Sequence, residues 1–96
     1  MRLVYSADAI ADLDRLRRFI AEHDPAAALR IVDALIDRIE RLADHPAMGR
    51  LLDDSPALLA VREFAFGDHV IRYMLASKAL VVLRVWHHRE DGRSAK

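Results

Sequence analysis

The residues best suited to bind or transform a partner are arginines and histidines in the second half of the sequence. Arg62, Arg72 and Arg84 stand in otherwise apolar segments, and Trp86-His87-His88-Arg89 follows the last of them. A guanidinium presents a planar fork of donors to carboxylates and phosphates, and an imidazole can exchange protons near neutral pH. These residues, with Arg50 after a glycine, define the candidate functional surface.

Two interpretations of the strand arginines stay open. An arginine inside an apolar segment is costly to bury unless it faces solvent or the acidic groups of a partner. The guanidiniums could reach water from a half-exposed sheet, or they could form a recognition surface on that sheet. On the second interpretation, the expected partner-binding residues are Arg50, Arg62, Arg72, Arg84, Trp86, His87 and Arg89.

Other candidate sites are weaker. Four carboxylates follow one another at helical spacing between residues 33 and 44, but arginines alternate with them, which is typical of a solvated helix face. Adjacent strand residues point to opposite faces, so His87 and His88 are not expected to bind one metal ion together. No serine is placed beside a histidine and an acid in a recognisable arrangement. We therefore predict no metal, no cofactor and no catalytic nucleophile.

Charge and composition narrow the function further. The chain has 96 residues, 15 basic and 15 acidic groups, and a pI near 7.0, which argues against binding nucleic acid chiefly through its phosphates. Residues 1–48 hold seven basic and nine acidic groups, and residues 49–96 hold eight and six, so the balance changes from minus two to plus two. We expect no sequence-specific nucleic-acid binding by this chain alone.

The sequence has no cysteine, and no apolar run is longer than Ala79 to Leu83. The absence of cysteine fits a reducing compartment, and an apolar run of this length is too short to span a bilayer. The N-terminus also lacks the apolar stretch of a signal peptide. A cytoplasmic protein without membrane contact is the expectation.

The first half of the chain predicts a strand and two helices. Arg2 to Tyr5 is an apolar-rich segment that Ser6 ends as a helix N-cap. Ile10, Leu13, Leu16 and Ile20, with Phe19 beside them, then form the apolar stripe of an amphipathic helix, while Asp12 and its charged neighbours are expected on the other positions.

A second helix is predicted to begin at Asp24-Pro25, where Asp is the N-cap and Pro the first helical residue. Its apolar positions, which include Leu29 and Leu35, predict packing on both the first helix and a sheet. His45-Pro46 ends the helix, and Gly49 is expected to take a positive φ. The short connection between the two helices predicts an antiparallel hairpin.

The second half predicts a meander of strands. Residues 51 to 58 read as a loop, and three segments rich in β-branched and aromatic residues follow at Leu59 to Phe66, His69 to Ala76 and Ala79 to His87. The sequence leaves open whether Arg72 and Arg84 share a face. We predict one α+β domain over residues 1–89, a helical hairpin packed on an antiparallel sheet in the order β-α-α-β-β-β, and a frayed polar tail over residues 90–96.

The order of these elements and their residues resembles the ParE branch of the RelE/ParE toxin superfamily over nearly the whole chain. The matching motifs are Tyr5-Ser6-x-x-Ala9-x-x-Asp12-Leu13, Pro25-x-Ala27-Ala28, Leu42-x-x-His45-Pro46-x-x-Gly49-Arg50, Arg62-x-Phe64, Ile71-x-Tyr73 and Arg84-Val85-x-His87-x-Arg89. The resemblance implies the toxin of a type II toxin–antitoxin pair. It also implies an antitoxin whose C-terminal segment wraps the toxin.

Members of the superfamily have one of two activities. RelE-like toxins cut mRNA on the ribosome and typically carry an arginine ahead of the strand tyrosine, where this sequence has Val70. ParE-like toxins, the resemblance implies, bind and block DNA gyrase without chemistry of their own. A neutral chain with two lysines favours gyrase inhibition and no enzymatic activity.

Two alternatives are retained. A ribosome-dependent nuclease would have to use Arg62, Arg84, His87 and His88 as its phosphate and acid–base groups. An inactive protein that keeps the toxin fold is the third possibility, because no residue of the sequence is uniquely tied to chemistry.

Overall fold

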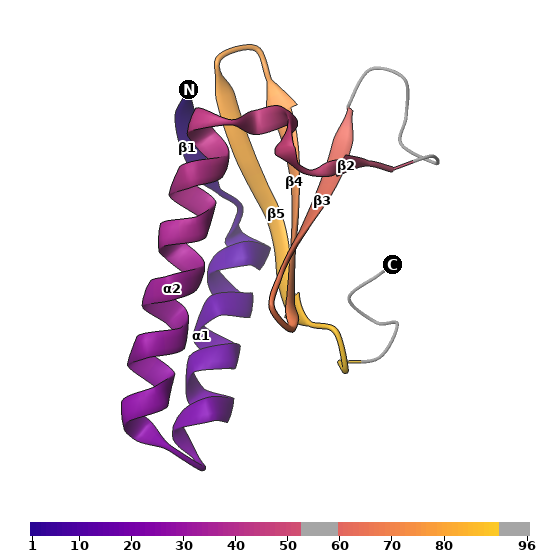
Figure 1. Cartoon of the computed structure of the whole chain (residues 1–96). Helices are drawn as coiled ribbons and strands as arrows, with labels where there is room; N and C mark the ends of the chain where they lie inside the picture. Colours follow the sequence, from indigo (N-terminus) through magenta and orange to yellow (C-terminus); the bar gives the residue numbers. More distant parts are fainter. Residues whose placement is uncertain (53–59, 91–96) are drawn as a thin grey trace.

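The chain folds into two helices and a five-stranded sheet, shown in Figure 1. A computed structural model describes residues 1–52 and 60–90, so the predicted strand start at Leu59, loop residues 53–58 and tail residues 91–96 lie outside the described residues. The elements are β1 (Arg2–Tyr5), α1 (Ala7–Ala21), α2 (Pro25–Asp44), the 3-10 turn η1 (Pro46–Met48), β2 (Arg50–Leu51), β3 (Val61–Phe66), β4 (His69–Ala76) and β5 (Ala79–His87).

Side-chain caps start both helices where they were predicted. Ser6 Oγ accepts the Ala9 N–H at 3.0 Å and donates to the Leu83 carbonyl at 2.9 Å, which ties the start of α1 to β5. Asp24 accepts the Ala27 N–H at 3.1 Å at the start of α2. These bonds satisfy backbone donors that a helix end leaves without partners.

The sheet has the strand order β1-β5-β4-β3-β2. The pairs among β2, β3, β4 and β5 are antiparallel, but β1 runs parallel to β5, with Leu3 opposite Leu80. The predicted antiparallel meander of the last three strands is confirmed, and the sheet as a whole is mixed because β1 joins it in parallel. A parallel pair needs a long crossover connection, and here the helical hairpin is part of that connection. The short edge strand β2 was not predicted, since two residues carry no periodic pattern.

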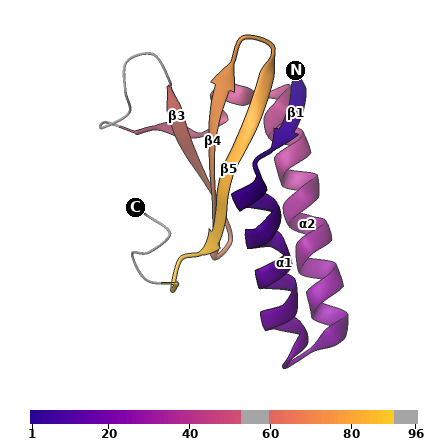
Figure 2. The same ribbon diagram turned by 180° about the vertical axis from the view of Figure 1, so that it is seen from behind.

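Both helices cover the same face of the sheet, as Figures 1 and 2 show from opposite sides. The most deeply buried side chains come from α2 and the central strands and include Leu35, Ile39, Leu42, Ile71, Tyr73, Leu80, Val82 and Val85. In α1 the predicted apolar stripe is partly wrong: Ile10 and Phe19 are 58% and 63% exposed, while Asp12 is 2% exposed. The buried positions are Ala9, Asp12 and Leu16, so a charged side chain lies within the stripe.

Gly49 lies close to the core but does not take the expected positive φ, since its φ is −78°. A Cβ at this position would lie 2.5 Å from Tyr73 Oη and 2.9 Å from the Glu63 carbonyl oxygen. The Gly49 N–H donates to Tyr73 Oη at 2.8 Å, and that hydroxyl donates to the Pro46 carbonyl at 2.7 Å. Glycine is required here for close approach to the tyrosine, and this contact joins the turn after α2 to β4.

Candidate functional site

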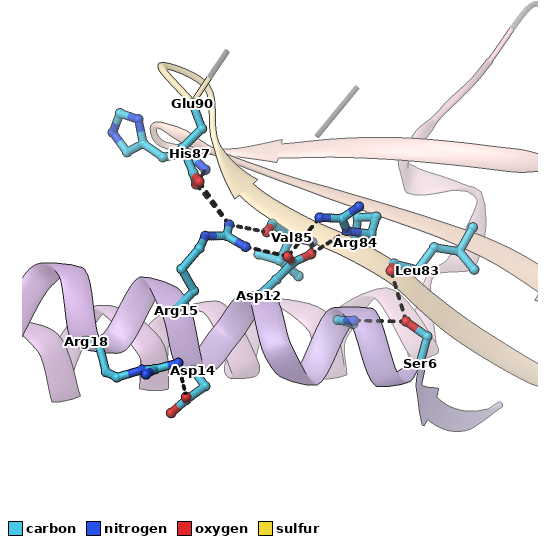
Figure 3. A network of polar contacts seen from close by, with 11 residues as sticks. Ser6, Asp12, Asp14, Arg15, Arg18, Leu83, Arg84, Val85, His87 and Glu90 are labelled. Atoms are coloured by element: carbon cyan, nitrogen blue, oxygen red, sulfur yellow. Dashed lines mark hydrogen bonds and ion pairs between the residues drawn. The ribbon is translucent and has the colours of Figure 1, made fainter. Parts of the chain in front are cut away.

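Asp12 is a buried carboxylate that joins α1 to β5, as the network in Figure 3 shows. Its Oδ2 accepts from Arg84 Nε at 2.7 Å and from the Val85 N–H at 2.9 Å. Its Oδ1 accepts from Arg84 Nη2 at 3.0 Å and also from Arg15. Four donors therefore surround one carboxylate, and three of them belong to charged groups.

The charge state of Asp12 follows from this arrangement. Burial by itself raises the pKa of Asp12, but the hydrogen bonds from Arg84, Val85 and Arg15 outweigh it and hold the pKa below its ordinary value. Asp12 is thus ionised at neutral pH. The hydrogen bond to Asp12 in turn raises the pKa of Arg84.

The three strand arginines have intramolecular partners. Arg84 pairs with Asp12, and Arg72 Nε donates to Glu63 Oε2 at 2.9 Å. Arg62 Nη1 donates to the Gly49 carbonyl at 2.8 Å. Neither interpretation of the sequence anticipated acidic or carbonyl partners within the chain.

The register between β4 and β5 places Arg72 directly opposite Arg84, with an irregularity between Arg72 and Tyr73. The two guanidiniums nevertheless bond to carboxylates from different elements, Glu63 on β3 and Asp12 on α1. Arg72 also lies over the ring of Trp86, 5.1 Å from the centroid, and Trp86 is 7% exposed. The predicted binding residues Arg72 and Trp86 thus contact each other within the sheet, and Arg84 joins the sheet to α1.

Arg50 and Arg89 differ from the strand arginines because they are exposed. The Arg50 side chain is 69% exposed, and it forms a long ion pair with Glu63 Oε1 at 3.8 Å. Arg89 follows the end of β5. Of the predicted partner-binding residues, these two present the most accessible cations.

The histidines at the end of β5 do not lie as predicted. The rings of His87 and His88 stack with centroids 5.0 Å apart, because β5 ends at His87 and the chain turns there. The expectation that they point to opposite faces is therefore wrong. His69 was not predicted as a site residue, yet its ring is 5.1 Å from that of His87, its cross-strand partner. The hairpin signal at Ser77-Lys78 could have revealed that His69 and His87 lie side by side, since both stand at the strand ends far from that turn.

A groove lies between the second half of α1 and this end of the sheet, with a volume of about 590 Å³. Aliphatic and aromatic side chains from the helices line one part, and ionisable side chains from the ends of β4 and β5 line the other. The lining residues are Arg15, Leu16, Phe19, Ile20, Ile31, Asp68, His69, His87, Arg89 and Glu90. We call this feature the imidazole groove.

Of the residues proposed for a nuclease, His87 and His88 lie side by side, but Arg62 lies apart from them. Arg62 lies opposite Tyr73, whereas His87 lies opposite His69. Tyr73 and His69 are four residues apart on β4, which is about 13 Å of strand. Within residues 1–52 and 60–90, no three His, Asp or Glu side chains are grouped in a way that could hold a metal ion. No helix in the same part of the chain combines the length and apolarity needed to cross a membrane.

A β-strand, a helical hairpin and an antiparallel meander, joined by the Gly49–Tyr73 contact and the Asp12–Arg84 pair, define a small α+β fold. A chain in the structure titled "Chromosomal ParDE TA system from P. aeruginosa" has this fold, with a TM-score of 0.77 and 21% identity over 91% of this chain and 95% of that one. Residues 3–92 match the family described as "ParE toxin of type II toxin-antitoxin system, parDE". The chain belongs to this family.

Curated relatives of similar length agree with this assignment. Toxin RelE3 of Caulobacter vibrioides is 36% identical over 81 residues, which cover 82% of this chain and 85% of the relative. Toxin RelE1 of the same organism is 31% identical over 89 residues, covering 93% and 95%. The protein is a type II toxin of the RelE/ParE superfamily, and such a system implies a cognate antitoxin partner.

Proposed function

We propose that this toxin arrests growth by binding DNA gyrase and blocking it, and that its cognate antitoxin prevents this contact. The observation that carries the proposal is the use of the strand arginines within the fold. Arg62, Arg72 and Arg84 donate to Gly49, Glu63 and Asp12, so their guanidiniums contribute to stability. RNA binding depends on cations that can neutralise phosphates, and pairing inside the chain disfavours that use.

Partner contact on this proposal uses the exposed cations and the groove. Arg50 and Arg89 are the predicted binding residues that reach solvent. The imidazole groove offers an apolar wall from α1 and α2 with ionisable groups beside it. Apolar anchors surrounded by polar groups are typical of protein–protein contacts.

The test is a supercoiling assay with purified gyrase, run beside a cell-free translation assay with the same toxin preparation. We expect loss of supercoiling with translation intact, and recovery when the cognate antitoxin is added first. A charge reversal at Arg50 should weaken gyrase inhibition, whereas Lys78→Glu at the β4–β5 turn is the matched control. Intact supercoiling with loss of translation would reverse the proposal.

A second candidate is a nuclease, favoured by one observation. The imidazoles of His69 and His87 lie 5.1 Å apart at the imidazole groove, where one could act as base and the other as acid. Cleavage of mRNA in the translation assay, lost in His87→Asn, would support this candidate. Unimpeded growth on expression of folded protein would instead indicate an inactive toxin fold.

A further inference from the structure

Three imidazoles gather where β4 begins and β5 ends. His69 and His87 are cross-strand partners with an edge-to-face ring contact at 5.1 Å, and the ring of His88 stacks on that of His87 at 5.0 Å. A proton gained by one ring therefore lies close to a neighbouring ring and to any charge that this neighbour carries. Imidazoles are the side chains whose charge changes most readily between pH 5 and 8.

The charged groups that face these rings come from three elements. They are Asp68 in the turn before β4, Arg15 on α1, and Arg89 and Glu90 in the turn after β5, whereas α2 contributes Ile31 to the same groove. Burial, followed by the charge of His87, holds the pKa of His69 below its ordinary value. His69 thus stays neutral to lower pH than an ordinary histidine.

One hydrogen bond of the turn from His87 to Glu90 requires a neutral His87 ring. Its Nδ1 accepts the Arg89 N–H at 3.1 Å, and its carbonyl accepts the Glu90 N–H at 2.8 Å. Because Nδ1 is an acceptor, the proton of the neutral ring is on Nε2. An imidazolium has donors on both nitrogens and accepts nothing, so protonation of His87 removes the bond to Arg89 and sets two donors against each other.

Glu90 connects this turn to α1. Its carboxylate accepts the His87 N–H at 2.8 Å and pairs with Arg15 Nη2 at 3.0 Å. Arg15 in turn bonds to Asp12, so the contact extends to the buried network of Figure 3. The same carboxylate thus holds both the backbone of the turn and Arg15, so a change in the shape of the turn moves the acidic partner of Arg15.

We propose that His87 and Glu90 form a proton-operated latch. With His87 neutral, the turn is closed and Glu90 holds Arg15 at the edge of the imidazole groove. Protonation of His87 opens the turn, draws Glu90 from Arg15 and leaves the groove with added positive charge. The device requires neither gyrase nor antitoxin and stands apart from the choice of target.

The test uses the full chain and follows three groups by NMR between pH 7.5 and pH 5.5. We expect the Arg15 Nε–H signal to shift in step with the titration of the His87 ring. The protection of the Arg89 amide from solvent exchange, corrected for the intrinsic rate, should fall about five-fold, as expected for loss of one hydrogen bond. Both changes should reverse when the pH is raised.

Variants separate the latch from general effects of pH. In His87→Asn the amide oxygen replaces Nδ1 as a permanent acceptor, so the Arg15 and Arg89 signals should no longer respond. His45→Asn removes an imidazole outside the cluster and should respond like the wild type. Glu90→Gln should place the Arg15 signal at its low-pH position already at pH 7.5. An Arg15 signal that stays fixed while His87 titrates, or a response in His87→Asn equal to the wild type, overturns the proposal.

Discussion

Replacement of Asp12 by asparagine is expected to cause a large loss of stability. The side chain is 2% exposed and accepts from Arg84, Arg15 and the Val85 N–H. Asparagine keeps the shape but removes the charge, and its amide N–H groups replace one acceptor with donors. Removing one partner of a buried ion pair costs about 3–5 kcal/mol. We expect about 3 kcal/mol, because Arg84 and Arg15 are 29% and 34% exposed and water screens part of the loss.

Urea unfolding at pH 7.5, followed by the fluorescence of Trp86, measures this difference. Asp14→Asn is the matched control, since Asp14 stands in the same helix and pairs with Arg17 and Arg18 at the surface. It should leave the unfolding midpoint unchanged. A loss below about 1 kcal/mol for Asp12→Asn would show that the network contributes no more than an exposed pair.

The pH dependence of the same variant gives an independent check. Because the folded pKa of Asp12 is lowered, its contribution is present above the unfolded pKa of about 3.9 and is lost as pH falls through the folded value. The difference in free energy of unfolding between the wild type and Asp12→Asn should therefore disappear below about pH 4. An advantage that persists unchanged well into that acid range contradicts the assigned ion pair.

Three further outcomes concern the turn after α2 and the histidine cluster. Gly49→Ala should cost about 1–3 kcal/mol in urea unfolding because its Cβ would clash with Tyr73 Oη, whereas Gly67→Ala, with open space and a φ of +58°, should cost about 1 kcal/mol. Tyr73→Phe leaves the Gly49 N–H without its acceptor and should cost about 1–3 kcal/mol in the same assay; an unchanged midpoint contradicts the contact. Since the folded pKa of His69 is lowered, stability should fall from pH 7.5 to pH 5.5, and by less in His69→Gln; equal falls would refute this assignment.

Local signals in the sequence predict most of the fold. Ser6 and Asp24 cap the helices where their side chains indicated, and the turns at Gly67-Asp68 and Ser77-Lys78 separate the strands as expected. Capping and turn formation depend on a few adjacent residues, so a single sequence reveals them. The direction of β1 depends on which strand it pairs with, and no local signal fixes that choice.

The site was less predictable because its contacts join distant parts of the chain. Asp12 and Arg84 are 72 positions apart, and a helix pattern alone assigns a carboxylate to the solvent face. The irregularity between Arg72 and Tyr73 changes the register, so the pairing of these arginines also could not be obtained from alternation. Glu90, expected at the start of a frayed tail, instead holds Arg15.

The internal pairing of the strand arginines changes what the neutral composition means for a partner. A guanidinium held by Asp12 or Glu63 has little net charge to offer at a distance, because the carboxylate beside it cancels its field. Attraction of a partner then depends on the exposed cations Arg50, which shares Glu63 with Arg72, and Arg89, and on the ionisation of the imidazole cluster. On the proposed function, salt should therefore weaken target binding only modestly at neutral pH and more strongly at pH 5.5, when imidazolium charge is added. A polyanion held by many phosphate contacts would instead show a steep salt dependence at both pH values.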